Sequence, residues 1–160
     1  MSFCKIILYI IIYNIIMNVI ENNTIFDTTQ FPVVKIIFGK SINSEKEFEE
    51  IKRLWMMQYT RKQNFYIVFN TEKLDSLNVS YIYNLAKFIK ELKKLSNEDQ
   101  YLKVSIIYIK SFFVNSLLKL YLKISNPLSK VYIVNKSNDI DIICNKLING
   151  EKVEGYTEYN

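Results

Sequence analysis

Short apolar runs alternate along this chain with longer segments in which apolar residues recur at helical spacing. The runs are rich in β-branched and aromatic side chains and are bounded by turn residues, which is typical of core strands. They predict four strands, at residues 33–38, 65–69, 104–109 and 131–134. The stretch from the third run to the fourth reads as strand, helix and strand, which is the pattern of a parallel crossover unit.

Four helices complete the alternation. Ser44 and Glu47 form a capping box ahead of apolar positions that continue at helical spacing to about Gln58. The other three helices are predicted at residues 82–92, 112–124 and 140–148. Because crossovers between parallel strands are right-handed and short, we expect an α/β fold, a mostly parallel β-sheet with helices packed on its faces.

The amino-terminal segment allows several interpretations. Residues 6–16 are apolar apart from Asn14 and follow Lys5, but a membrane-spanning helix needs about 20 residues. The segment is a signal or anchor, an over-extended reading frame ahead of a true start at Met17, or a β-rich segment that covers the sheet. We therefore expect an apolar N-terminal extension, residues 1–21, and a single α/β domain, residues 22–160.

The composition removes several kinds of catalysis. The chain has no His, the commonest general base and the usual zinc ligand. Its three Gly are too few for a dinucleotide fingerprint or a P-loop. Cys4 and Cys144 lie at opposite ends, without the spacing of a metal, redox or disulfide motif, which fits a reducing, cytoplasmic compartment. We expect no enzymatic activity, no cofactor and no metal.

Polar residues follow several of the predicted strands. Open α/β sheets usually bind ligands at the carboxyl ends of their strands. Alternatively, such residues cap helices or satisfy loop backbone. The residues in question are Asn70, Thr71, Lys110, Ser111, Asn135 and Lys136.

Positive charge is concentrated in the second half of the chain. The net charge is +5, and the segment from Lys87 to Lys136 holds ten Lys against three acidic residues. Its lysines either face anionic membrane lipid or simply solvate helix surfaces in a chain whose composition reflects an AT-rich genome. Nucleic acid is disfavoured because Arg occurs only twice. The candidate membrane-contact residues are Lys87, Lys90, Lys94, Lys119 and Lys123.

The predicted helix at residues 112–124 is apolar nearly all round. Such a helix needs partners on two sides. It is either a core helix that also contacts a neighbour or a helix that shields a cavity for an apolar ligand.

Several segments resemble, in matching order, motifs of the CRAL-TRIO lipid-binding domains. Residues 31–40, FPVVKIIFGK, are similar to an "RPV" strand followed by Gly and a basic residue, and residues 66–74 to "VVIFDLEGL". Residues 111–120, SFFVNSLLKL, are similar to "PWFFNALWKL". The Asn-Pro and Ser-Lys-Val of residues 126–131 resemble "DP..SKI", and residues 154–159 resemble the terminal "E-x-GG".

The resemblance implies binding of one lipid or other small hydrophobic molecule, without catalysis and peripheral to a membrane. In this family the helix after the third core strand gates the cavity. The implied ligand-binding residues are therefore Phe112, Phe113, Leu117 and Tyr121.

The related STAS (SpoIIAA-like) fold shares the same order of strands and helices. Its phosphorylated helix start would fall near residues 78–81, which makes Ser80 a candidate switch. This alternative implies a regulatory protein-protein interaction module without a lipid ligand. The two readings differ in one feature, because the first needs a cavity behind the helix at 112–124 and the second a filled core.

Overall fold

A six-stranded sheet with the order β1-β2-β4-β6-β7-β8 runs through the protein in a computed structural model that describes residues 24–95 and 97–159. The four central strands are parallel: β2 (Val33–Ile37), β4 (Phe65–Asn70), β6 (Leu102–Tyr108) and β7 (Lys130–Val134). The mostly parallel sheet expected from the sequence is thereby confirmed. The predicted extension, residues 1–21, lies outside the described residues.

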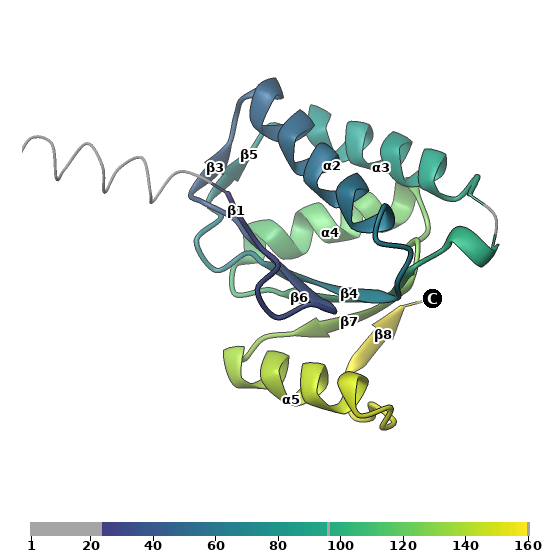
Figure 1. Ribbon diagram of the computed structural model, residues 1–160. Helices are drawn as coiled ribbons and strands as arrows, with labels where there is room; N and C mark the ends of the chain where they lie inside the picture. Colours follow the sequence, from purple (N-terminus) through teal and green to yellow (C-terminus); the bar gives the residue numbers. More distant parts are fainter. Residues whose placement is uncertain (1–23, 96, 160) are drawn as a thin grey trace, which may run out of the picture.

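Two short antiparallel strands close the edges of the sheet. β1 (Ile25–Asp27) pairs with β2, and β8 (Thr157–Tyr159) pairs with β7. A separate parallel pair, β3 (Ser41–Ile42) and β5 (Ser76–Leu77), lies near the carboxyl end of the central strands (Figure 1). A 3-10 turn, η1 (Asn97–Asp99), precedes β6.

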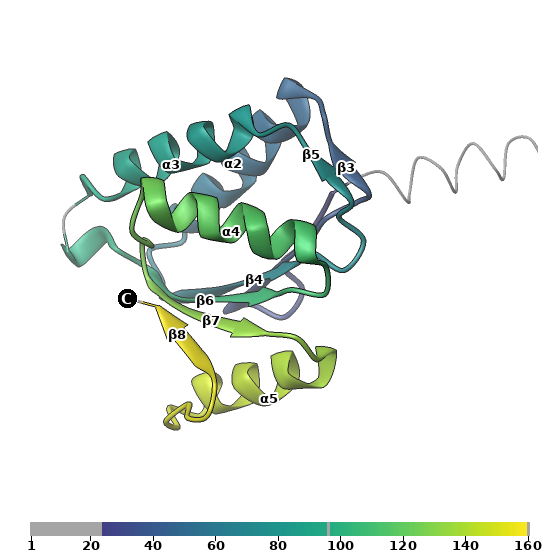
Figure 2. The same cartoon turned by 180° about the vertical axis from the view of Figure 1, so that it is seen from behind.

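The helices are divided unequally between the two faces of the sheet. α2 (Glu45–Tyr59), α3 (Ser80–Leu92) and α4 (Phe112–Ile124) cover one face, whereas α5 (Ser137–Ile148) alone covers the other (Figures 1 and 2). The α/β architecture with helices on both faces agrees with the sequence prediction. No helix in residues 24–95 or 97–159 is long and apolar enough to cross a membrane.

Side-chain caps fix where two of these helices begin. Ser44 Oγ accepts a hydrogen bond from the backbone N–H of Glu47 at 3.2 Å, as the capping box predicts. Ser111 Oγ accepts one from the N–H of Val114 at 3.1 Å. α4 ends at Ser125, whose backbone is extended, two residues before Pro127.

Alternation along the strands builds a separate core on each face. Ile67 of β4 packs with Trp55 and Ile89 beneath the helical layer. Its neighbour Val68 points to the other face and packs with Ile106 and with α5. Each central strand is therefore buried on both faces, which explains why its sequence reads as a continuous apolar run.

Two adjacent isoleucines of α5 test this packing. Ile143 is fully buried, whereas Ile142 is 47% exposed. We expect Ile143→Ala to lower the free energy of unfolding by about 2–5 kcal/mol, because it removes buried methylenes and leaves a cavity. Ile142→Ala should change it by less than about 0.5 kcal/mol. Urea unfolding followed by circular dichroism measures both, and equal losses would contradict the placement of α5.

Candidate hydrophobic binding site

A cavity of about 180 Å³ lies between the sheet and its three-helix layer. Its floor is formed by strand residues on the helical face, Phe69 of β4, Ile107 of β6 and Val131 of β7. The carboxyl-edge end is lined by Ile42 and Leu77 from the β3-β5 pair. The cavity therefore occupies the centre of the helix-covered face of the fold.

All three helices of the layer contribute apolar side chains to the walls. From α2 come Phe48, Ile51 and Trp55, and from α3 come Tyr81, Ile82, Leu85 and Ile89. α4 contributes Val114, Leu117, Leu118 and Tyr121. These positions repeat at three or four residues, so each helix presents one face to the cavity.

The polar side chains in the lining are largely engaged with the protein itself. Thr71 is buried and its hydroxyl donates to the carbonyl oxygen of Tyr108. The Ser105 and Ser129 hydroxyls lie 3.0 Å apart and form a hydrogen bond. Tyr121 Oη donates to the carbonyl of Asn126 at 3.4 Å, and burial raises the pKa of its phenol. Among the described residues, no charged side chain lines this cavity.

The last two turns of α2 carry buried polar atoms that lack a hydrogen-bond partner. These atoms are Trp55 Nε1, Gln58 Oε1 and Tyr59 Oη. Trp55 is only 3% exposed, and its ring lies 5.5 Å from those of Phe69 and Phe88. Each unpaired atom costs about 1–3 kcal/mol of stability. Burial also raises the pKa of the Tyr59 hydroxyl, which therefore stays protonated.

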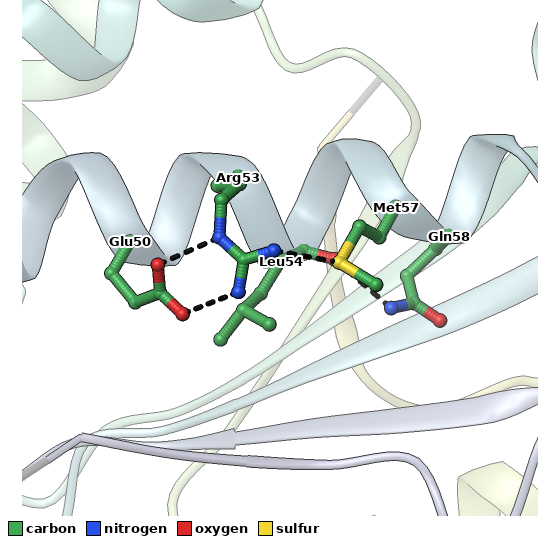
Figure 3. A network of polar contacts seen from close by, with 5 residues as sticks. All are labelled: Glu50, Arg53, Leu54, Met57 and Gln58. Atoms are coloured by element: carbon green, nitrogen blue, oxygen red, sulfur yellow. Dashed lines mark hydrogen bonds and ion pairs between the residues drawn. The ribbon is translucent and has the colours of Figure 1, made fainter.

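Local polar contacts link side chains along α2 (Figure 3). Arg53 donates to both carboxylate oxygens of Glu50, at 2.6 and 2.7 Å, and to Met57 Sδ at 3.0 Å. The Arg53 hydrogen bond lowers the pKa of Glu50, and the pKa of Arg53 is raised in return. Gln58 Nε2 donates to the carbonyl of Leu54 at 2.9 Å, while its Oε1 stays unpaired.

Two of the four residues implied by the CRAL-TRIO resemblance line the cavity. These are Leu117 and Tyr121. Phe113 is half-buried and packs in the cluster that contains Ile109, outside the cavity lining. Phe112 departs from the expectation, because its side chain is 84% exposed and borders a polar cleft instead.

This second cleft, of about 540 Å³, lies at the carboxyl ends of β6 and β7. It gathers four of the polar residues that the sequence placed at strand ends, Lys110, Ser111, Asn135 and Lys136. Lys110 pairs with Glu72 at 3.0 Å, and Ser111 caps α4. Both residues thus already have a structural role.

The candidate membrane-contact lysines lie on, or just beyond, two helices of the three-helix layer. α3 and α4 contact each other in that layer. Lys87 and Lys90 of α3, Lys94 just beyond it, and Lys119 and Lys123 of α4 are all exposed. These five exposed lysines, on or just beyond α3 and on α4, are referred to here as the basic face.

Ser80, the candidate switch of the alternative reading, is the first residue of α3 and is exposed. Its backbone N–H and its hydroxyl both interact with Asn78 Oδ1, at 3.0 and 2.9 Å. The residue lies outside the cavity lining. A role in switching stays a prediction.

Most of the lining was not identified from the sequence as a site. The helical spacing predicts only that each helix has an apolar face, which includes Ile51, Trp55, Leu85 and Ile89. Residues that line a cavity recur at the same helical spacing as residues of a filled core, so the sequence holds no signal that separates the two. Nothing else supplies one, since comparisons with protein-family models, curated proteins and solved structures gave no match.

No group of three or more potential metal ligands occurs within the described part of the chain. The side chains that line the cavity are almost all apolar, which favours binding through apolar contact. It presents no pair of acid and base groups in the lining.

Two substitutions that enlarge a buried side chain, one beside the cavity and one in the core on the opposite face of the sheet, test whether the cavity is empty space. Leu117 borders the cavity, and Ile106 is fully buried in the opposite core. Leu117→Phe should keep or raise the free energy of unfolding, because filling a cavity commonly adds about 0.5–2 kcal/mol. Ile106→Phe should lower it by about 1–3 kcal/mol through overpacking. Chemical denaturation compares them, and an equal loss in both variants would argue against the cavity.

Proposed function

We propose that this protein binds a small hydrophobic molecule, or the apolar part of a lipid, in the cavity beneath α4, and catalyses no reaction on it. The observation that carries the proposal is the cavity itself, which is lined by apolar side chains of the sheet and of α2, α3 and α4. Burial of apolar surface supplies the binding free energy, at about 25 cal/mol per Å². The resemblance to CRAL-TRIO domains points to the same kind of ligand.

The size of the cavity limits what it holds at rest. A dry apolar cavity of about 150 Å³ binds benzene, and this one measures about 180 Å³. Sites for drug-sized ligands usually reach about 300–1,000 Å³. A ring or a short alkyl chain therefore fits directly, whereas a longer lipid chain requires the helical layer to open.

α4 is the helix best suited to that opening. Only Val114 and Leu117 of its 13 residues are buried, whereas six residues of the equally long α3 are buried. Its carboxyl end is attached to the body of the protein, since Lys93 Nζ and Tyr121 Oη both donate to the carbonyl of Asn126. Movement about this attached end would widen the cavity at the smallest cost in buried surface.

A bulky substitution on α4 provides the direct test. We expect native mass spectrometry of the full chain, purified from cells, to detect a stoichiometric hydrophobic adduct that lipid extraction identifies. Leu117→Trp should abolish the adduct without unfolding the protein, because the indole takes up the cavity. Ser116→Trp is the matched control. Ser116 directly precedes Leu117 but is exposed, so this variant should keep the adduct.

A clean apo mass for the unmodified chain, with no uptake from mixed liposomes, would contradict the proposal. The chain would then be better explained as an interaction module of the STAS kind, and Ser80 would become the residue to examine. Retention of the adduct in Leu117→Trp would place the ligand elsewhere on the protein.

We also propose that the basic face docks the protein on anionic membranes. A juxtamembrane Lys contributes about 1 kcal/mol of attraction to an anionic surface. The five lysines of the face are opposed on α3 and α4 by Glu91 alone among the described residues. The same two helices line the cavity, so docking would bring the ligand site close to the bilayer.

Neutralising part of the basic face tests this docking. The triple variant Lys87→Gln, Lys90→Gln and Lys119→Gln should bind phosphatidylserine vesicles at least about tenfold more weakly in co-sedimentation, because it removes three attractive charges. The control neutralises Lys136, Lys146 and Lys152 on the α5 side, which leaves the same net charge. Equal weakening in both triples would show that total charge, and not this face, determines binding.

A further inference from the structure

β6 and β7 are neighbouring parallel strands whose following helices, α4 and α5, lie on opposite faces of the sheet (Figures 1 and 2). A backbone hydrogen bond of 2.9 Å, from the Ile109 N–H to the carbonyl oxygen of Val134, joins the carboxyl ends of the two strands. Beyond it, Lys110 leads towards α4 and Asn135 towards α5. In open α/β sheets, ligands bind in the crevice at the carboxyl ends of strands that separate in this way.

The polar cleft of about 540 Å³ occupies this crevice. Its volume falls within the range of about 300–1,000 Å³ that is usual for small-molecule sites. Residues 155–157, which lead into β8 beside β7, form its third wall. The lining of this cleft and that of the apolar cavity have no residue in common. The cleft is therefore a second, separate candidate site.

The charged residues of the cleft lining are Lys110, Lys136 and Asp139. Both lysines are exposed, and the ion pair of Lys110 with Glu72 is open to solvent, so it holds the lysine only weakly. Partial burial raises the pKa of the Tyr156 phenol, and the charge and hydrogen bond of the Asp139 carboxylate raise it further. The phenol therefore stays protonated and satisfies that carboxylate, which leaves the two lysines to attract an anion.

Phe112 is the other unusual residue at this cleft. It borders the cleft, and its side chain, 84% exposed, is the most exposed large hydrophobic one in the described part of the chain. A phenyl ring in water gains free energy when a second flat ring covers it, because apolar surface is buried and the rings stack. At the border of a polar cleft, this ring offers apolar contact to a ligand whose other groups are polar.

We propose that the cleft between the ends of β6 and β7 binds a small phosphorylated molecule that carries a flat ring. Lys110 and Lys136 neutralise the phosphate, a common role of lysine, and the ring stacks on Phe112. Asn135 and Thr157, also in the lining, supply hydrogen bonds to the polar part of the ligand. The three Gly of the chain provide no glycine-rich loop, so side chains hold the phosphate. This proposal goes beyond the hydrophobic cavity and does not depend on it.

Three compounds divide the proposed ligand into its parts. AMP has a phosphate and a flat ring, adenosine has the ring alone, and ribose 5-phosphate has the phosphate alone. Isothermal titration calorimetry of the full chain should show that AMP binds at least about tenfold more tightly than either of the others, because it alone engages the lysines and the phenyl ring together. No binding of AMP at millimolar concentration would overturn the proposal.

Two substitutions of exposed residues assign the two parts. Lys136→Gln should weaken AMP about three- to tenfold, the range for one partly exposed charged contact, and leave adenosine unchanged. Phe112→Ala should weaken AMP and adenosine at least about fivefold through lost stacking, and leave ribose 5-phosphate unchanged. The matched controls are Lys152→Gln and Tyr83→Ala, which remove an exposed charge and an exposed ring outside the cleft lining. Both controls should keep the affinity for AMP.

Amide chemical shifts place the site directly. On addition of AMP to the isotope-labelled full chain, the largest changes should fall at residues 109–112, 135–139 and 155–157. Changes confined to the basic face, or equal losses of affinity in Lys136→Gln and Lys152→Gln, would overturn the proposal in favour of unspecific attraction to positive charge.

The apolar cavity is tested apart from this cleft. Leu117→Trp, which fills the cavity, should leave the affinity for AMP unchanged, and a parallel loss would show that the two sites are not separate. A chain that binds AMP in the cleft but carries no hydrophobic adduct would keep this proposal and contradict the proposed function. The reverse result would contradict this proposal alone.

Discussion

The order in which the parallel strands are added determines where a ligand cavity can form in this protein. β2, β4, β6 and β7 follow one another in a single direction across the sheet. Because successive crossovers share one hand, their helices α2, α3 and α4 all reach the same face. The turn to the antiparallel β8 brings α5 to the other face. One face therefore carries three helices that converge over a twisted surface, and the cavity lies where their side chains meet.

The four central strands and the four helices that follow them could be predicted from the sequence, because burial on both faces leaves a clear pattern. For α4 the sequence predicts the residue range but not the side chains that line the cavity. The observed range agrees with the predicted one, yet Phe112, which the CRAL-TRIO resemblance implies as a ligand-binding residue, is exposed. Helical phase explains the difference, since Phe112 shares its stripe with Lys119 and Lys123, whereas Leu117 and Tyr121 share the inner stripe with Val114.

The edge strands and the cavity could not be predicted, for different physical reasons. β1 and β8 are three residues long and exposed or half-buried, so neither has the apolar run of a buried strand. They exist because the sheet offers them unpaired backbone groups. The cavity depends on how Trp55, Leu85 and Leu117, which come from three separate helices, fill a common space. Local spacing contains no information on that filling.

α4 also separates two environments of opposite character. Its inner stripe, with Leu117 and Tyr121, borders a cavity lined by no described charge, while Lys119 and Lys123 face outward. An anionic lipid head attracted to the outer stripe could not follow an apolar tail inside without losing its counter-charges. In the proposed function, one helix thus sorts the two ends of an amphiphile by charge. Any displacement of α4 at a membrane would change access to the cavity and the position of those lysines together, so the two properties are coupled through a single rigid element.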